Sequence, residues 1–228
     1  LFPVAELAEI VKSRSDAWFH VDGVNAAGKI AVELAPTAID MFSISAHKFH
    51  GPKGVGALYI RRGVDPASLQ IGGGQERGRR AGTEAVHQIA GLGKAAELAS
   101  DLTPMRGVRE LRDRLEDGIL AEFEFARLNG TSDRSVRLPN TSNISFLGLN
   151  GEMILARLDA EGICVSTGSA CNAESHTASA VMQAMEIPFE QALGSVRLSL
   201  GRYNSMNEVE RVLRVLLRII GDLRRIAG

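Results

Sequence analysis

Residues 43–59 read Ser-Ile-Ser-Ala-His-Lys-Phe-His-Gly-Pro-Lys-Gly-Val-Gly-Ala-Leu-Tyr, and this stretch decides the fold. Its first residues predict a strand that ends near Lys48, and Gly51, Pro52 and Gly54 predict a turn directly afterwards. A lysine amine held at the end of a rigid strand can form a Schiff base with an aldehyde cofactor, which then acts as an electron sink. From spacing alone, a surface lysine that follows a core strand is the alternative.

The composition is that of a globular protein with one large domain or two modest ones. The chain has 228 residues, of which 45% are hydrophobic and 23% charged. Its net charge of -1 gives no electrostatic reason to expect nucleic acid or an anionic membrane as a partner. Two cysteines make no disulfide framework, so we expect a reduced, cytoplasmic setting. The chain opens at Leu1 almost directly in a helix-like segment, and we expect it to be part of a longer protein.

Helical and strand-like patterns alternate along the chain, which predicts an α/β layered fold. The expected strands are 18–21, 41–46, 56–60, 142–146, 163–166 and 195–200. The expected helices are 3–12, 84–99, 105–125, 151–158, 178–185 and 208–226, the last with a capping box made by Ser205 and Glu208. Asp, Thr and Pro interrupt the pattern near 101–104, so we expect one domain over 1–103 and a second over 104–228.

Polar residues stand where the first two expected strands end. Asp22 closes an apolar run and precedes glycine, and ligands of α/β proteins bind at such strand ends. A carboxylate there could keep a pyridinium nitrogen protonated, although a turn or helix-capping aspartate fits Asp22 equally well. Ser43, Ser45 and His47 alternate, so a strand would turn them to one face, where they could hold a phosphate. Lys48 can reach the same ligand only if the backbone turns at the end of the strand.

Two residues of the second half, Cys171 and Arg197, could also carry chemistry. Cys171 follows small residues over 166–170, which suits an exposed nucleophilic thiol. Cys164 lies in an apolar segment, and we expect it to be a buried structural thiol. Arg197 could clamp a substrate carboxylate with two parallel hydrogen bonds, or it could be a surface arginine. No spacing of Cys and His suits four zinc ligands, so no metal is expected.

Taken together, these segments resemble the cysteine desulfurases of the pyridoxal-phosphate-dependent class V aminotransferase superfamily. The order and spacing of the motifs are similar to the subgroup that serves iron–sulfur cluster assembly and nitrogen fixation. The resemblance covers nearly the whole chain and rests on these motifs: His20-Val21-Asp22; Ser45-Ala46-His47-Lys48 followed by Gly51-Pro52-Lys53-Gly54-Val55-Gly56; Arg80-Ala81-Gly82-Thr83 with Val86-His87-Gln88; Ser166-Thr167-Gly168-Ser169-Ala170-Cys171; and Ser195-Val196-Arg197-Leu198-Ser199-Leu200-Gly201-Arg202.

The resemblance implies a fold and a cofactor site. Residues 1–103 would be part of the large domain of a pyridoxal-phosphate-dependent transferase, a mostly parallel sheet with helices, and 104–228 a smaller α+β C-terminal domain that carries the cysteine loop. Lys48 would hold pyridoxal 5'-phosphate and move protons on the substrate, and Asp22 would pair with the pyridinium nitrogen. Ser45 and His47 would bind the phosphate. Thr83 would reach the phosphate of the neighbouring subunit, so a homodimer is implied.

The resemblance also implies a reaction. Arg197 would bind the carboxylate of L-cysteine, and Cys171 would take the substrate sulfur, leaving alanine and a persulfide for an acceptor protein such as an iron–sulfur scaffold. Asn25 stands where the family usually has glutamine against the ring oxygen of the cofactor, so that bond could be lost or bridged by water. Thr177-Ala178-Ser179 replaces the usual Glu-Pro-Ser after the cysteine, which could alter how the loop is anchored.

Two alternatives stay open at this point. The substrate could be selenocysteine or another amino acid, since the motifs do not separate these cases. The chain could also be a catalytically incomplete fragment. The family's N-terminal part carries a ring-stacking histidine, a Gly-Thr phosphate loop, and asparagines for cofactor and substrate, and none of these lies in the present residues.

Overall fold

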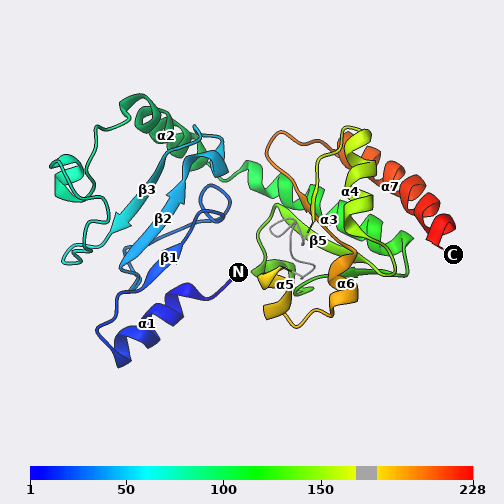
Figure 1. Cartoon of the computed structure of the whole chain (residues 1–228), viewed down its shortest axis with the longest axis horizontal. Coiled ribbons are helices and arrows are strands. Elements are labelled where there is room, and N and C mark those ends of the chain that lie inside the picture. Colours follow the sequence, from blue (N-terminus) through cyan, green and yellow to red (C-terminus); the bar gives the residue numbers. More distant parts are fainter. Residues whose placement is uncertain (168–178, 228) are drawn as a thin grey trace. The chain divides into compact units, whose positions relative to one another are not determined.

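The computed structural model of the chain describes residues 1–167 and 179–227. It contains two compact units, Leu1–Leu102 and Thr103–Gly228, each of which has its own sheet and helices (Figure 1). Helices and strands alternate along the chain, and the predicted α/β class is confirmed.

The first unit is built on a mixed sheet of three strands, which lie side by side in the order β1, β2, β3 (Figure 1). These strands are β1 (His20–Asp22), β2 (Met41–Ser45) and β3 (Gly56–Ile60). β1 runs parallel to β2, with Asp22 opposite Ser43, whereas β3 runs antiparallel to β2, with Ser45 opposite Gly56. β2 and β3 lie where the sequence predicts strands. β1 lies slightly further along the chain than predicted, because the polar Asp22 still pairs in the ladder.

Two helices accompany this sheet, α1 (Val4–Arg14) and α2 (Val86–Ala99). α2 packs against a short 3-10 helix, η1 (Ala46–Phe49), which directly follows β2. The buried residues of this contact are mostly alanines: Ala46, Phe49, Ala95 and Ala99. Small side chains let the two backbones approach closely, so α2 supports the turn that carries Lys48.

In the turn after η1, position 51 has no room for a residue larger than glycine. His50 adopts the left-handed conformation, with φ of 68°, and the N–H of Gly51 donates to the carbonyl of Ala46 at 2.8 Å. A Cβ atom at Gly51 would lie 2.8 Å from Cβ of Ala46 and 3.0 Å from its carbonyl oxygen. Both distances are shorter than ordinary van der Waals contacts, so a larger residue must displace the backbone of the turn.

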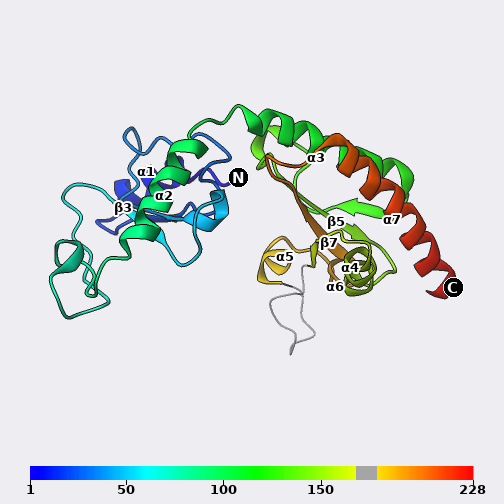
Figure 2. The ribbon, with the colours of Figure 1, turned by 90° about the horizontal axis from the view of Figure 1, so that it is seen from above.

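The second unit has four antiparallel strands in the order β4, β5, β7, β6. The strands are β4 (Ala126–Leu128), β5 (Thr141–Phe146), β6 (Ser166–Thr167) and β7 (Ser195–Ser199). The helices are α3 (Pro104–Glu122), α4 (Gly151–Ala160), α5 (Ala180–Ala184), α6 (Phe189–Leu193) and α7 (Met206–Ala227). α3 and α7 run side by side along the sheet, as Figure 2 shows.

Most of the elements predicted for this unit are present, and the predicted capping box is confirmed. The N–H of Ser205 donates to the Glu208 carboxylate at 2.7 Å, and the N–H of Glu208 donates to the Ser205 hydroxyl at 3.4 Å. The prediction that Cys164 is buried is wrong, since this thiol is exposed. The reason is that β6 pairs only at Ser166 and Thr167, so Cys164 precedes the ladder instead of lying within it.

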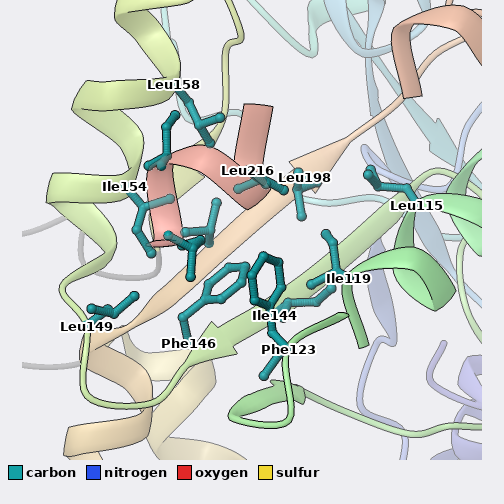
Figure 3. Packing of buried hydrophobic residues seen from close by; sticks show 14 of the residues in the cluster. Leu115, Ile119, Phe123, Ile144, Phe146, Leu149, Ile154, Leu158, Leu198 and Leu216 are labelled. Atoms are coloured by element: carbon teal, nitrogen blue, oxygen red, sulfur yellow. The ribbon is translucent and has the colours of Figure 1, made fainter. Parts of the chain in front are cut away.

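The core of the second unit lies where α3, α4 and α7 meet β5 and β7. The ring of Phe146 in β5 meets the ring of Phe123 edge to face, with 5.7 Å between the centroids. Figure 3 shows how apolar side chains from these elements converge: Leu115, Ile119, Phe123, Ile144, Phe146, Leu149, Ile154, Leu158, Leu198 and Leu216. This core holds β7 in place.

A charged network is buried beside this core. Glu116 of α3 is 1% exposed and accepts two hydrogen bonds from Arg137, at 3.0 and 2.7 Å, and one from the Ser142 hydroxyl at 2.7 Å. Burial alone would raise the pKa of Glu116, but these hydrogen bonds and the charges of Arg137 and Arg112 outweigh it and lower the pKa. The carboxylate is therefore bound in its charged form.

We expect Glu116→Gln to destabilise the second unit by about 3 kcal/mol, because it leaves the partly buried guanidinium of Arg137 without its buried counterion. Urea unfolding followed by circular dichroism measures this loss. The matched control is Glu110→Gln on the same helix, whose exposed ion pair with Arg106 contributes about 0–1 kcal/mol.

The Glu116 pair also makes stability depend on pH. The pKa in the folded state is lowered, so the stabilisation is fully present above the ordinary value near 4.5 and is lost as pH falls through the folded value. The Gln variant lacks this component, and its stability should fall less on acidification below about pH 4.5. If the free energy of unfolding falls equally in the wild type and in Glu116→Gln below about pH 4.5, Glu116 is not the group that causes this pH dependence.

We expect Gly51→Ala to cost about 1–3 kcal/mol, because the new methyl group overlaps Ala46 and shifts the turn after η1. The measurement is the free energy of unfolding in urea. Gly93→Ala in α2 is the control, since a Cβ atom there meets nothing within 4 Å and alanine favours the helix. A Gly51→Ala protein as stable as the Gly93→Ala protein would contradict the steric argument.

Candidate active site

Chemically active side chains gather at one edge of the first unit's sheet. Asp22 is the last residue of β1, and Ser45 is the last residue of β2. Because the two strands run parallel, their carboxyl ends meet at the same edge, which is where α/β proteins bind ligands. Lys48 follows three residues after the end of β2, in η1. The carboxylate of Asp22 and the amine of Lys48, which are far apart in sequence, thus both lie at the carboxyl ends of these two strands.

The backbone turns directly after β2, as the alternation of His47 and Lys48 requires if both are to reach one ligand. The 3-10 helix η1 begins at Ala46, immediately after the strand. The Ser45 hydroxyl lies 2.8 Å from Nδ1 of His47, so these two polar groups form one hydrogen-bonded pair. His47 and Lys48 are both exposed, and their polar atoms are open to a ligand.

The carboxylate of Asp22 is oriented by its own turn. Its Oδ1 accepts a hydrogen bond from the N–H of Val24 at 2.9 Å, and the side chain is exposed. This bond fixes one oxygen, and the second oxygen of the carboxylate can still accept from a cationic or N–H group. Asn25 lies in the same turn and is also exposed.

Lys29 joins the two strand-end turns, and it is not among the site residues predicted from the sequence. Its ammonium donates to the carbonyl of Asn25 at 2.9 Å and to the carbonyl of Lys48 at 3.5 Å. Burial, followed by the nearby charge of Lys48, lowers the pKa of Lys29. The only signal in the sequence is the pair Gly28-Lys29 soon after the Asp22 motif, and no periodic pattern marks it.

Thr83 is not joined to this cluster by any hydrogen bond of the described residues. It is exposed and lies in the segment ahead of α2, beside Gly82, whose carbonyl accepts from Arg80 at 2.9 Å. The N–H of Gly82 donates to the side chain of Gln75 at 3.1 Å. These bonds stabilise the segment around Thr83 and leave its hydroxyl at the surface.

The other two candidates belong to the second unit. Arg197 lies in the middle of β7, is exposed, and pairs with Ser166 of β6. Ser166 stands five positions before Cys171, which itself lies outside the described residues. The next residue, Thr167, is buried and donates its hydroxyl to Glu152 at 2.5 Å. β7 therefore holds both Arg197 and the start of the segment that leads to Cys171.

The donor set of the first unit fits pyridoxal phosphate. It supplies a primary amine for the aldehyde, a carboxylate for the pyridinium nitrogen, and a hydroxyl with an imidazole for the phosphate: Lys48, Asp22, Ser45 and His47. In residues 1–167 and 179–227, no three His, Cys, Asp or Glu side chains are grouped to hold a metal ion. Of the helices in those residues, none is both long and apolar enough to cross a membrane.

Comparison with curated proteins gives a consistent group of relatives. A cysteine desulfurase of Sinorhizobium fredii is 50% identical over 226 residues, which cover 98% of this chain and 58% of the relative. A cysteine desulfurase of Nostoc is 48% identical over 229 residues and covers 100% of this chain and 56% of that protein. The chain thus spans somewhat more than half the length of these relatives.

Solved structures agree in fold. A NifS-like protein superposes with a TM-score of 0.87 at 37% identity, over 97% of this chain and 57% of its own. The NifS-like protein of Rickettsia africae has a TM-score of 0.85 at 30% identity, over 96% and 57% of the two chains. The family model for aminotransferase class-V matches residues 1–212. Since this match covers most of its length, the chain belongs to the class-V aminotransferase family.

Proposed function

We propose that the protein is a pyridoxal-phosphate-dependent cysteine desulfurase that converts L-cysteine to L-alanine and delivers the sulfur as a persulfide. One observation carries the proposal, namely that Asp22, the Ser45–His47 pair and Lys48 share the carboxyl edge of two parallel strands. The relatives named as cysteine desulfurases, at about half identity over the whole chain, support the same substrate.

Each side chain of the edge has one part in holding the cofactor. The amine of Lys48 would hold the cofactor through its aldehyde and would carry protons to and from the substrate carbon, while Asp22 would keep the ring nitrogen protonated. Ser45 and His47 donate hydrogen bonds to the phosphate. Asn25, shorter than the family's glutamine, serves the ring oxygen directly or through water. When bound, pyridoxal phosphate supplies the electron sink for the reaction.

The second unit supplies the substrate residues of the proposed reaction. The planar guanidinium of Arg197 holds the carboxylate of L-cysteine with two parallel hydrogen bonds. Cys171, as thiolate, attacks the substrate sulfur; the carbon–sulfur bond breaks and the carbon takes up a proton. The products are L-alanine and a Cys171 persulfide, so the sulfur and all hydrogens of the two reactants are retained.

The proposal includes two protein partners. Thr83, exposed ahead of α2, suits a second copy of the chain whose phosphate it reaches, so the enzyme acts as a homodimer. The persulfide passes its outer sulfur to a thiol of an acceptor protein such as an iron–sulfur scaffold. Because the acceptor and Cys171 must stay reduced between cycles, we propose a cytoplasmic setting.

We expect Lys48→Ala to abolish alanine formation from L-cysteine and the visible absorbance of bound cofactor, since it removes the amine proposed to hold the aldehyde. Alanine is measured by amino-acid analysis of the purified holoenzyme, and circular dichroism checks the fold. The control is Lys94→Ala, which removes an exposed lysine of α2 that pairs with Glu97. Alanine production by the Lys48 variant at the wild-type rate would rule out the assigned role.

We expect Cys171→Ala to retain the bound cofactor but to lose sulfur transfer to an acceptor protein by at least about a hundred-fold, because no thiolate accepts the sulfur. Transfer is measured with radioactive L-cysteine and a thiol-containing scaffold protein. Cys164→Ala is the matched control, since it removes the other thiol. Undiminished sulfur transfer by the Cys171 variant would overturn the assigned role of this thiol. Faster turnover of selenocysteine than of cysteine in a competition assay would overturn the proposed substrate.

A further inference from the structure

We infer that Lys29 is a positioning residue that holds the turn carrying Lys48 against the turn carrying Asp22 and Asn25. This inference rests on the proposed function, since it assigns Lys29 a part in presenting the Lys48 amine to the cofactor. Among the described residues, the ammonium of Lys29 donates to backbone carbonyls of the two turns. It therefore acts through the backbone geometry of its neighbours.

Lys29 donates to two backbone segments that are distant in sequence and close together in the fold. Its ammonium donates to the carbonyl of Asn25 at 2.9 Å, on the turn after β1, and to the carbonyl of Lys48 at 3.5 Å, on η1 after β2. Asn25 and Lys48 are 23 positions apart in sequence. A single charged group thus bridges the two loops whose side chains form the candidate cofactor site.

The carbonyl of Lys48 needs such a donor. It belongs to the last turn of η1, where helix carbonyls have no partner within the helix. A cation at the carboxyl end of a helix is favourable, because the unsatisfied carbonyls there carry partial negative charge. Lys29 supplies this donor from outside the segment, which fixes η1 relative to β1.

The residue before Lys29 makes this approach possible. Gly28 has φ of 72°, and a Cβ atom there would lie 3.0 Å from Cβ of Phe49 and 3.0 Å from Cβ of Ala99. The turn after β1 therefore packs directly on η1 and α2. With the backbone this close, the side chain of Lys29 reaches the Lys48 carbonyl.

The placement of Lys29 is unfavourable for the charge itself. The side chain is partly buried, and burial together with the charge of Lys48 lowers its pKa. Within the described residues no carboxylate lies within ion-pair distance of Lys29. Placing a charged amine at this partly buried position costs free energy. We therefore attribute Lys29 to the function of the site and not to the stability of the fold.

The first test is hydrogen exchange in the cofactor-free protein. The N–H groups of His50 and Gly51 both donate to the carbonyl of Ala46, so they report whether the turn is closed. We expect Lys29→Met, which keeps the length but removes the charge, to speed exchange of these two amides about ten-fold. Lys29→Arg, which keeps a cation with donors, should stay within about three-fold of the wild type. Wild-type exchange in the Met variant would overturn the inference.

The second test measures attachment of the cofactor at Lys48. Pyridoxal phosphate is added to the cofactor-free enzyme, the adduct is reduced with borohydride at timed intervals, and labelled peptides are identified by mass spectrometry. We expect labelling of Lys48 to be about ten-fold slower in Lys29→Met, since a misplaced reacting group loses one to two orders of magnitude in rate. Thermal stability should be unchanged or slightly higher, which a purely structural role would not give.

The two tests separate this inference from the proposed function. A wild-type protein that is never labelled at Lys48 would overturn the proposed cofactor site, and the exchange of the His50 and Gly51 amides would still decide whether Lys29 holds the turn. Labelling of Lys48 at equal rates in the wild type and in Lys29→Met would overturn the positioning role while leaving the proposed function intact.

Discussion

The parallel pairing of β1 with β2 is the constraint on which the candidate site depends. Two strands that run in the same direction place their carboxyl ends together, so Asp22 and the turn with Lys48 share an edge. An antiparallel pair would separate them by the length of a strand. A slip of one residue would turn Asp22 to the opposite face of the sheet. The chemistry of the first unit thus follows from strand direction and register.

The turns at the strand ends then decide what the side chains can do. Alternation along β2 alone would direct His47 and Lys48 to opposite faces, and η1 removes that conflict by changing the backbone course at Ala46. The turn is compact because Gly28 and Gly51 leave no room for a Cβ atom beside their neighbours. Backbone packing of small residues therefore sets the geometry in which the polar side chains act.

Local pattern was sufficient where a strand-like segment is paired over its whole length. β2 and β3 were predicted correctly for that reason, and Lys48 was identified because it follows such a strand within three residues. Cys164 was assigned wrongly, since an apolar segment looks like a buried strand even when only its last residues pair. Lys29 was missed because its partner carbonyl on Lys48 is distant in sequence, and a long-range contact leaves no periodic trace.

The residues proposed for the reaction belong to both units, so destabilising one unit should affect different steps from destabilising the other. The first unit offers the groups for ring and phosphate, while Arg197 and the segment that leads to Cys171 depend on β7. β7 in turn rests on the core that Glu116 borders. Loss of Glu116 should therefore weaken sulfur transfer while cofactor attachment at Lys48 persists, whereas loss of Lys29 should slow cofactor attachment and with it every later step. Retained attachment of the cofactor at Lys48 therefore distinguishes a defect of the second unit from a defect of the first.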